Sequence, residues 1–178
     1  MKKRLISILL CGLLAAACIG CGEKTYSISY NYAECKVEDV KDPMVFKKGD
    51  EVTINQNNDN IGNKNGSYKL KINYVKYLSN ENVYLIEYEY TNINMDCGYL
   101  SINLKNITDD KNNSISINIR ESNKNEESKG QGAEVVEDGE TCVVRECFNV
   151  VNKDAESLKI YQPYTNDKNV YFEIEIDK

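Results

Sequence analysis

The sequence contains no histidine and no tryptophan, and it has only two prolines. Histidine is the commonest general base, the usual group that activates serine or cysteine nucleophiles, and a common ligand of catalytic zinc. Its absence removes the most frequent machinery for hydrolysis. We therefore expect a non-enzymatic protein that holds no cofactor and no metal ion.

The chain also lacks an apolar run long enough to span a membrane, which takes about 20 residues. The longest apolar stretch, residues 5–17, is shorter, follows Lys2, Lys3 and Arg4, and ends in small residues. A basic start, a short apolar segment and small residues are typical of a secretory signal peptide. We predict that residues 1–17 are such a signal peptide.

Two cysteines stand directly behind this leader. The three alanines before Cys18 resemble the bacterial lipobox, in which a diacylglyceryl group is attached to the cysteine thiol before cleavage. We favour lipidation at Cys18; the alternatives are lipidation at Cys21, or plain secretion after cleavage near Ala17. Residues 18–47 are then a lipid-anchored tether, with or without an edge strand, on the outer face of the bacterial cytoplasmic membrane, where two acyl chains make attachment durable.

Charge argues against several partners. The formal net charge is −6, and the leader carries three basic and no acidic residues, so the mature chain has a net charge of −9. An acidic protein is not attracted to nucleic acid or to anionic lipid by its overall charge. We expect the membrane, through the lipid anchor, and another surface or envelope protein as partners. The abundance of Asn, Lys, Ile and Tyr indicates an AT-rich genome and, with the lipobox, a Gram-positive bacterium.

The cysteine count does not define a disulfide framework. Cys11 is removed with the leader, and Cys18 is expected to carry the lipid. The remaining cysteines are Cys21, Cys35, Cys97, Cys142 and Cys147. An odd number leaves at least one thiol over, and pairing cannot be read from sequence. Cys142 and Cys147 are five positions apart, so a regular strand points them to opposite faces and only a bulge would let them bridge.

Short stretches of alternating apolar and polar residues fill the rest of the chain. Residues 68–77 change phase near Asn73 and Tyr74, which predicts a β-bulge. Residues 84–90 place tyrosines and Ile on one face and glutamates on the other. The other predicted strands cover residues 26–32, 52–54, 100–104, 115–119, 142–150, 158–163 and 170–176, and residues 121–132 are predicted to be a loop. Because no window shows a helical period, we predict an all-β, antiparallel sandwich over residues 48–178.

The order of five segments resembles a known domain. GDEVTI, YKLKINYVKYL, VYLIEYEYTNINMD, EDGETCVVRECFNVVNKDAESLKIY and VYFEIEID follow one another between residues 48 and 177. This order resembles the telokin-like domain of unknown function in Gram-positive lipoproteins. The resemblance implies an immunoglobulin-like β-sandwich with no established activity and no catalytic residue to carry over. It also implies structural roles for Asn92, at the end of a long strand, and for Gly139, in a turn before a later strand.

Several polar clusters are candidate sites, but each has a simpler interpretation. Residues 55–60 and 108–113 offer oxygen ligands for calcium, yet no glutamate closes the first loop, so solvated turns are favoured. The pairs Glu87 with Glu89 and Glu173 with Glu175 would hydrolyse glycosides only in a cleft with opposed geometry. On outer strand faces we expect them to have basic partners or to form a solubilising acidic patch.

The predicted function is a non-enzymatic extracytoplasmic module that binds or positions another surface component. The alternative is a small-ligand or ion receptor that serves a transporter or sensor. That alternative needs a concave pocket lined by tyrosines with one or two converging charges. Exposed rings of Tyr26, Tyr30 and Tyr32 would bind sugars or peptides, although packing in the core or at a sheet edge is favoured for them.

Overall fold

A computed structural model describes residues 24–31, 36–37, 43–57, 66–95, 104, 106–124, 136–161 and 168–178. Eleven strands and one short helix lie within these ranges. They are β1 (Thr25–Asn31), β2 (Lys36–Val37), β3 (Met44–Phe46), β4 (Glu51–Asn57), β5 (Gly66–Leu78), β6 (Val83–Asn92), β7 (Ile107–Asp109), β8 (Ser114–Ile115), α1 (Ile119–Lys124), β9 (Thr141–Asn149), β10 (Ser157–Tyr161) and β11 (Val170–Asp177). Within the described ranges, no helix has the length and apolar character that a membrane crossing requires.

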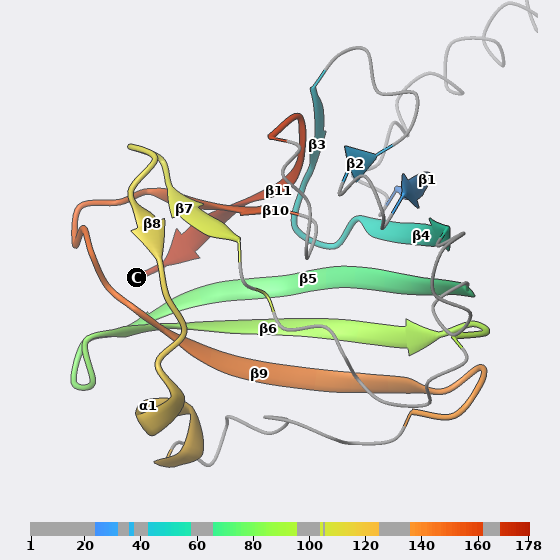
Figure 1. The fold of residues 1–178 in the computed structure, drawn as a ribbon. Coiled ribbons are helices and arrows are strands. Elements are labelled where there is room, and N and C mark those ends of the chain that lie inside the picture. The colour runs from blue at the N-terminus through green and yellow to red at the C-terminus, as the bar shows by residue number, and fades with distance from the viewer. Residues whose placement is uncertain are drawn as a thin grey trace, which may run out of the picture.

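The strands stack in two layers (Figure 1). One layer has the order β2-β1-β4-β5-β6-β9, and the other has the order β3-β11-β10-β7-β8. Most neighbours are antiparallel, whereas β1 with β4, β3 with β11 and β5 with β11 are parallel. This arrangement confirms the predicted β-sandwich.

The strand β5 joins the two layers at one edge. Its first half pairs with β4, and its second half pairs through Val75 and Lys76 with the end of β11. The register between β5 and β6 shifts between Ile72 and Tyr74, so the predicted bulge is confirmed. Because of that shift, Ile72 and Val75 are both fully buried although they are three positions apart.

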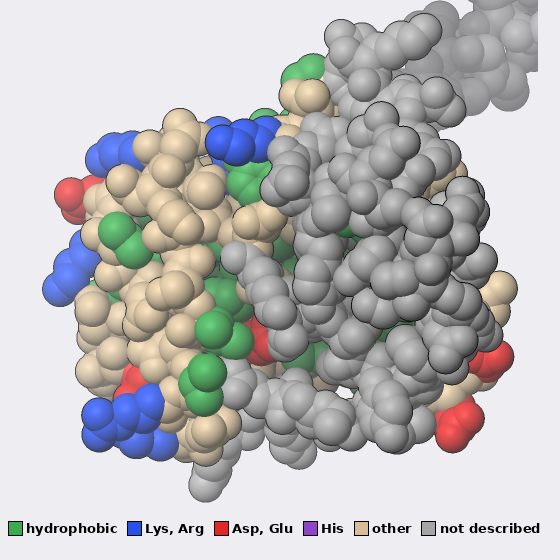
Figure 2. Space-filling model, in the orientation of Figure 1, with side chains coloured by type: hydrophobic (Ala, Val, Ile, Leu, Met, Phe, Trp, Pro, Cys, Tyr) green, Lys and Arg blue, Asp and Glu red, His purple; other side chains and the backbone are tan. Residues whose placement is uncertain are grey.

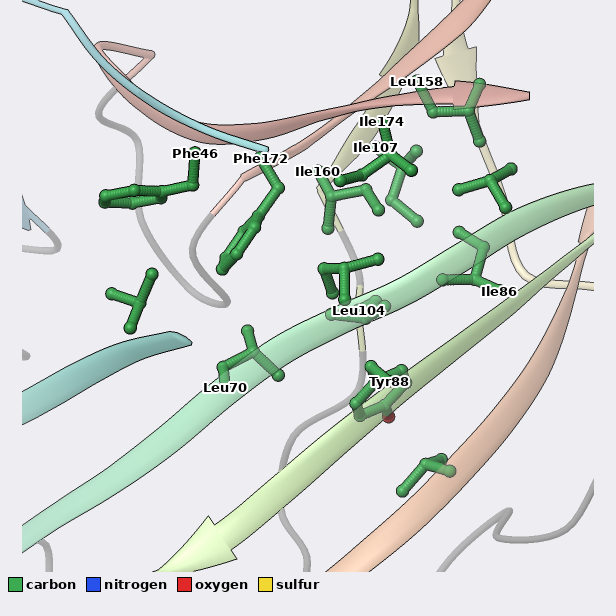
Figure 3. Close-up of a cluster of buried hydrophobic side chains, with 14 of the residues drawn as sticks. Phe46, Leu70, Ile86, Tyr88, Leu104, Ile107, Leu158, Ile160, Phe172 and Ile174 are labelled. Carbon is green, nitrogen blue, oxygen red and sulfur yellow. The ribbon is translucent and has the colours of Figure 1, made fainter. Parts of the chain in front are cut away.

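The core lies between the layers (Figure 3). Leu70 and Ile86 of the first layer face Leu158, Ile160 and Ile174 of the second, and all five side chains are at most 1% exposed. Burying apolar surface contributes about 25 cal/mol per Å². The alternation in the sequence therefore identifies the inner face of these strands correctly.

Residues before position 48 also contribute strands to the sandwich. The alternation over residues 26–32 corresponds to β1, which runs parallel to β4 over seven registered pairs. Tyr30 is 1% exposed, and Tyr26 is half-buried with its ring centroid 4.9 Å from that of Phe46. Packing is thus the correct interpretation for these two tyrosines, whereas Tyr32 lies outside the described residues.

The strand prediction for residues 115–119 is wrong at its end. Strand β8 stops at Ile115, and Ile119 begins helix α1 with 58% of its surface exposed. The Oδ1 atom of Asn118 accepts a hydrogen bond of 3.0 Å from the N–H of Glu121. This cap favours a helix where the alternating isoleucines predicted a strand. The helix also includes residues 121–124, which belong to the predicted loop 121–132.

Asn92 and Gly139 connect the end of β6 to the turn before β9. The N–H of Gly139 donates to the carbonyl of Asn92 at 2.7 Å, and Gly139 has a φ of 82°, which favours glycine. The Asn92 side chain is 1% exposed; its amide donates to the carbonyl of Val136 at 2.8 Å and accepts from the N–H of Met95 at 2.7 Å.

We predict that Asn92→Ala lowers the free energy of unfolding by about 2–4 kcal/mol, because it leaves a buried carbonyl and a buried N–H without partners. Chemical denaturation monitored by circular dichroism measures this loss. The exposed Asn123→Ala in α1 is the control and should change stability by less than about 0.5 kcal/mol. Equal effects of the two substitutions would contradict the assigned role of Asn92.

Candidate functional site

Two of the cysteines discussed as thiols or disulfide partners, Cys142 and Cys147, belong to the part of the chain that the structure describes. Cys18, Cys21, Cys35 and Cys97 lie outside the described residues. Cys142 and Cys147 lie on opposite faces of β9, as their spacing predicts. The side chain of Cys142 packs against the main core, whereas Cys147 is fully buried with Val83 and Leu85 on the outer face of the layer. Since β9 and β6 pair without a register shift, no bulge brings the two thiols together.

The first predicted carboxylate pair is held in an ionic network. The Nε atom of Arg145 donates to Glu87 at 2.6 Å, and the Asn73 amide donates to Glu87 at 3.0 Å and to Glu89 at 3.1 Å. Partial burial acts to raise the pKa of Glu87, but the hydrogen bonds from Asn73 and Arg145 outweigh it and lower the pKa. Arg145 is thus the expected basic partner of Glu87. Asn73, which lies at the bulge in β5, is a further hydrogen-bond donor to both glutamates.

The second pair lies elsewhere, because β5 separates β6 from β11. Glu173 and Glu175 point from one face of β11 into a surface groove with a volume of about 770 Å³. The groove is lined by Lys47, Lys48, Glu156, Ser157, Glu173, Glu175, Ile176, Asp177 and Lys178. The two glutamates are successive outward residues of one strand, so they do not oppose each other across the groove, as glycoside hydrolysis requires.

Two lysines from the turn between β3 and β4 form ion pairs across this groove. Lys47 contacts Glu173 at 2.7 Å, and Lys48 contacts Asp177 at 3.2 Å. Both lysine side chains remain more than half exposed. The groove thus contains both positive and negative groups, and the two ion pairs in it are exposed to solvent.

The turn that carries these lysines is organised by Asp50, which sequence analysis did not single out as a functional residue. Its side chain is 7% exposed and accepts the N–H of Lys47 at 2.8 Å and the N–H of Lys24 at 3.3 Å. The N–H of Glu51 also donates to the carbonyl of Lys24 at 2.9 Å. Asp50 therefore holds the first described residue of the chain against the turn. Gly followed by Asp is a pair typical of turns, and Gly49 and Asp50 are the local indication of this turn in the sequence.

The acidic segment 108–113 is a closed turn. Asp109 is fully buried and accepts the N–H groups of Lys111 and Asn113 at 2.9 and 2.8 Å, together with the Asn113 amide at 2.7 Å. Burial acts to raise the pKa of Asp109, but the hydrogen bonds from Asn113 and Lys111 lower it. Its oxygens thus serve the turn. Among the described residues, no group of three or more Cys, Asp or Glu side chains is placed to bind a metal ion.

Glu146 breaks the apolar pattern of β9, and the structure places it in the core. It is 1% exposed and accepts hydrogen bonds from the Tyr88 hydroxyl and the N–H of Leu104, while its Oε2 atom has no hydrogen-bond partner. Burial raises the pKa of Glu146 to about 7, although both hydrogen bonds act to lower it. Burial and the nearby Glu146 charge in turn raise the pKa of Tyr88.

We predict that Glu146 makes the protein less stable as the pH rises from about 4.5 to about 7. Below pH 4.5 the folded and unfolded chains both hold the proton, so Glu146 imposes no penalty; above pH 7 the folded chain must bury a carboxylate. The full penalty is about 3 kcal/mol. Denaturation curves of wild type and Glu146→Gln between pH 4.5 and 8 measure it.

As the pH rises across this range, the free energy of unfolding of Glu146→Gln should increase relative to that of wild type. The exposed Glu81→Gln serves as the matched control for removing a carboxyl group that the core does not enclose. A constant difference for Glu146→Gln would mean that this carboxyl group does not change its protonation on folding.

Comparisons with known proteins agree with the fold. No family model matches the chain, and no curated protein sequence matches it. Among solved structures, the chain is similar to MPT63, a secreted protein from Mycobacterium tuberculosis, with 12% sequence identity and a TM-score of 0.50. The similarity covers 75% of this chain and 99% of MPT63. At this identity the likeness concerns the fold, and the chain is an all-β, immunoglobulin-like sandwich.

Proposed function

We propose that this chain is a lipid-anchored, non-enzymatic module on the outer face of a bacterial cytoplasmic membrane, where it binds or positions another envelope protein. The observation that carries the proposal is the leader of residues 1–17 followed at once by Cys18. Among the described residues, the first strand is β1, which begins at Thr25, seven positions after Cys18. The description of MPT63 as a secreted protein supports an extracellular setting.

The segment order from residue 48 to residue 177 supports a place among the telokin-like domains of Gram-positive lipoproteins. The absence of histidine supports a role without catalysis. A sandwich offers sheet faces, edges and end loops for contacts with another protein, and none of these needs a reactive group.

The receptor alternative has weaker support. It requires a concave pocket lined by tyrosines, whereas among the described residues no tyrosine lines the groove beside β11, and seven of the nine that do line it are charged. Hydrolysis is also weakly supported, since Glu173 is paired with Lys47 and shares one strand face with Glu175. We therefore retain the binding module as the proposed function.

We predict that Cys18→Ser releases the protein from cells into the medium, because the thiol that takes the diacylglyceryl group is gone. Labelling with a clickable fatty acid, followed by fractionation of cells and medium, measures both lipidation and release. Cys21→Ser is the matched control and should stay labelled and cell-bound. The reverse result would assign the anchor to Cys21, and an unlabelled wild type would overturn the anchored location altogether.

The binding role calls for a separate experiment. Crosslinking on living cells that express the wild-type protein, followed by mass spectrometry, should yield reproducible crosslinks from the described strands to one envelope protein. These crosslinks should be lost when the protein is released by Cys18→Ser. An acylated, surface-exposed protein that yields crosslinks to no other protein would contradict the binding role while leaving the anchor intact.

A further inference from the structure

We propose that the turn formed by residues 47–50 is a membrane-contact surface, and that its partner is the phospholipid headgroup layer of the bilayer that holds the anchor. This inference rests on the proposed lipid anchor and adds to it an orientation of the domain. Three observations carry it: the length of chain before the fold, the attachment of Lys24 to the turn, and the charges that the turn presents.

The chain between the anchor and the fold is short. Lys24 is the first described residue, and it follows Cys18 by six positions and Cys21 by three. A fully extended chain spans at most about 3.5 Å per residue, so Lys24 lies within roughly 20 Å of an acylated Cys18 or roughly 10 Å of an acylated Cys21. Whichever cysteine carries the lipid, the start of β1 stays close to the headgroups.

The fold prevents this start from moving away from the turn. The Asp50 carboxylate accepts the N–H groups of Lys24 and Lys47, and the Lys24 carbonyl accepts the N–H of Glu51. From Thr25 onward, β1 pairs with β4 along its whole length. Peeling β1 away would expose the buried side chains of Ile28 and Tyr30, so the tether cannot gain length at low cost.

The turn next to this attachment point presents two adjacent amines that can contact lipid phosphate, although the groove beside them also holds four carboxylates. Lys47 and Lys48 are the only two adjacent basic residues after the leader. Their side chains are 62% and 53% exposed, and each is paired with a partly exposed carboxylate, Glu173 or Asp177. Exposed ion pairs contribute little stability, so these amines can exchange their carboxylates for lipid phosphates at small cost.

The opposite edge of the molecule then faces away from the membrane. Figure 1 shows β1, β3 and β4 at one edge and β9 with α1 at the other. Figure 2 shows separate groups of basic side chains, one along the upper margin and one at the lower left of this view. Arg120 and Lys124 of α1 are exposed and provide a basic pair on the far edge. Reversing the charge of this pair therefore tests whether the position of a basic pair matters, and not only its charge.

The test uses the purified, acylated full-length mature protein inserted into nanodiscs of phosphatidylethanolamine and phosphatidylglycerol that contain a gadolinium-chelating lipid. Paramagnetic relaxation of backbone amides reports the distance of each residue from the headgroups. We expect enhancement at Lys48, Gly49 and Glu51 to be several-fold larger than at Glu121, Ser122 and Asn123. The doubly charge-reversed variant with Lys47→Glu and Lys48→Glu should reduce this contrast, whereas Arg120→Glu with Lys124→Glu should not.

Mass spectrometry of the same sample shows whether the protein carries acyl chains, so a failure of the proposed anchor can be distinguished from a failure of the proposed orientation. A protein with acyl chains whose amides are relaxed equally at both edges, or most strongly in α1, would overturn the orientation and leave the anchored module standing. A mature protein without acyl chains would overturn both. Equal effects of the two charge reversals would show that the tether, and not the lysine pair, sets the distance, and would exclude the turn as a contact surface.

Discussion

The structure depends on the length and the bulge of β5. Thirteen residues give this strand one edge long enough for β4 along its first half and for the end of β11 along its second. The bulge between Ile72 and Tyr74 returns Val75 to the core face, which keeps both halves packed against the second layer. Without that correction of phase, the apolar residues of the second half would face solvent. The same bulge leaves Asn73 on the outer face, where it bonds Glu87 and Glu89.

Two buried carboxylates show how differently the fold treats the same chemical group. Asp50 receives two backbone N–H groups, and these bonds hold the beginning of β1 against the turn before β4. Glu146 lies between the layers with one oxygen unpartnered, and burial raises its pKa to about 7. An isolated charge in an apolar core is costly, so a neutral carboxyl group is the cheaper form at that position. One group therefore organises the turn beside the start of β1, while the other is a titratable carboxyl group enclosed in the core.

Sequence patterns predict the strands well and their partners poorly. Alternation identifies the inner faces of β5, β6 and β11, because residues two apart on a strand share a face. It fails at Ile119, where the local cap by Asn118 forms a helix. The pairing of Lys47 with Glu173 joins residues 126 positions apart. Nothing local specifies that contact, and it arises only because β3 and β11 become parallel neighbours.

The sequence alone determined the apolar segment near residue 5 and the cysteines that follow it, the acidic charge, the lack of histidine, and the all-β character. These properties depend on residue type and on spacing within a few positions. Tertiary structure decided that the strand β1, before residue 48, pairs in parallel with β4, that Glu146 is enclosed in the core, and that Asp50 brings Lys24 beside Lys47. Such features depend on which distant strands become neighbours. The strands pair so that all of their apolar faces are buried together, and this condition involves the whole chain.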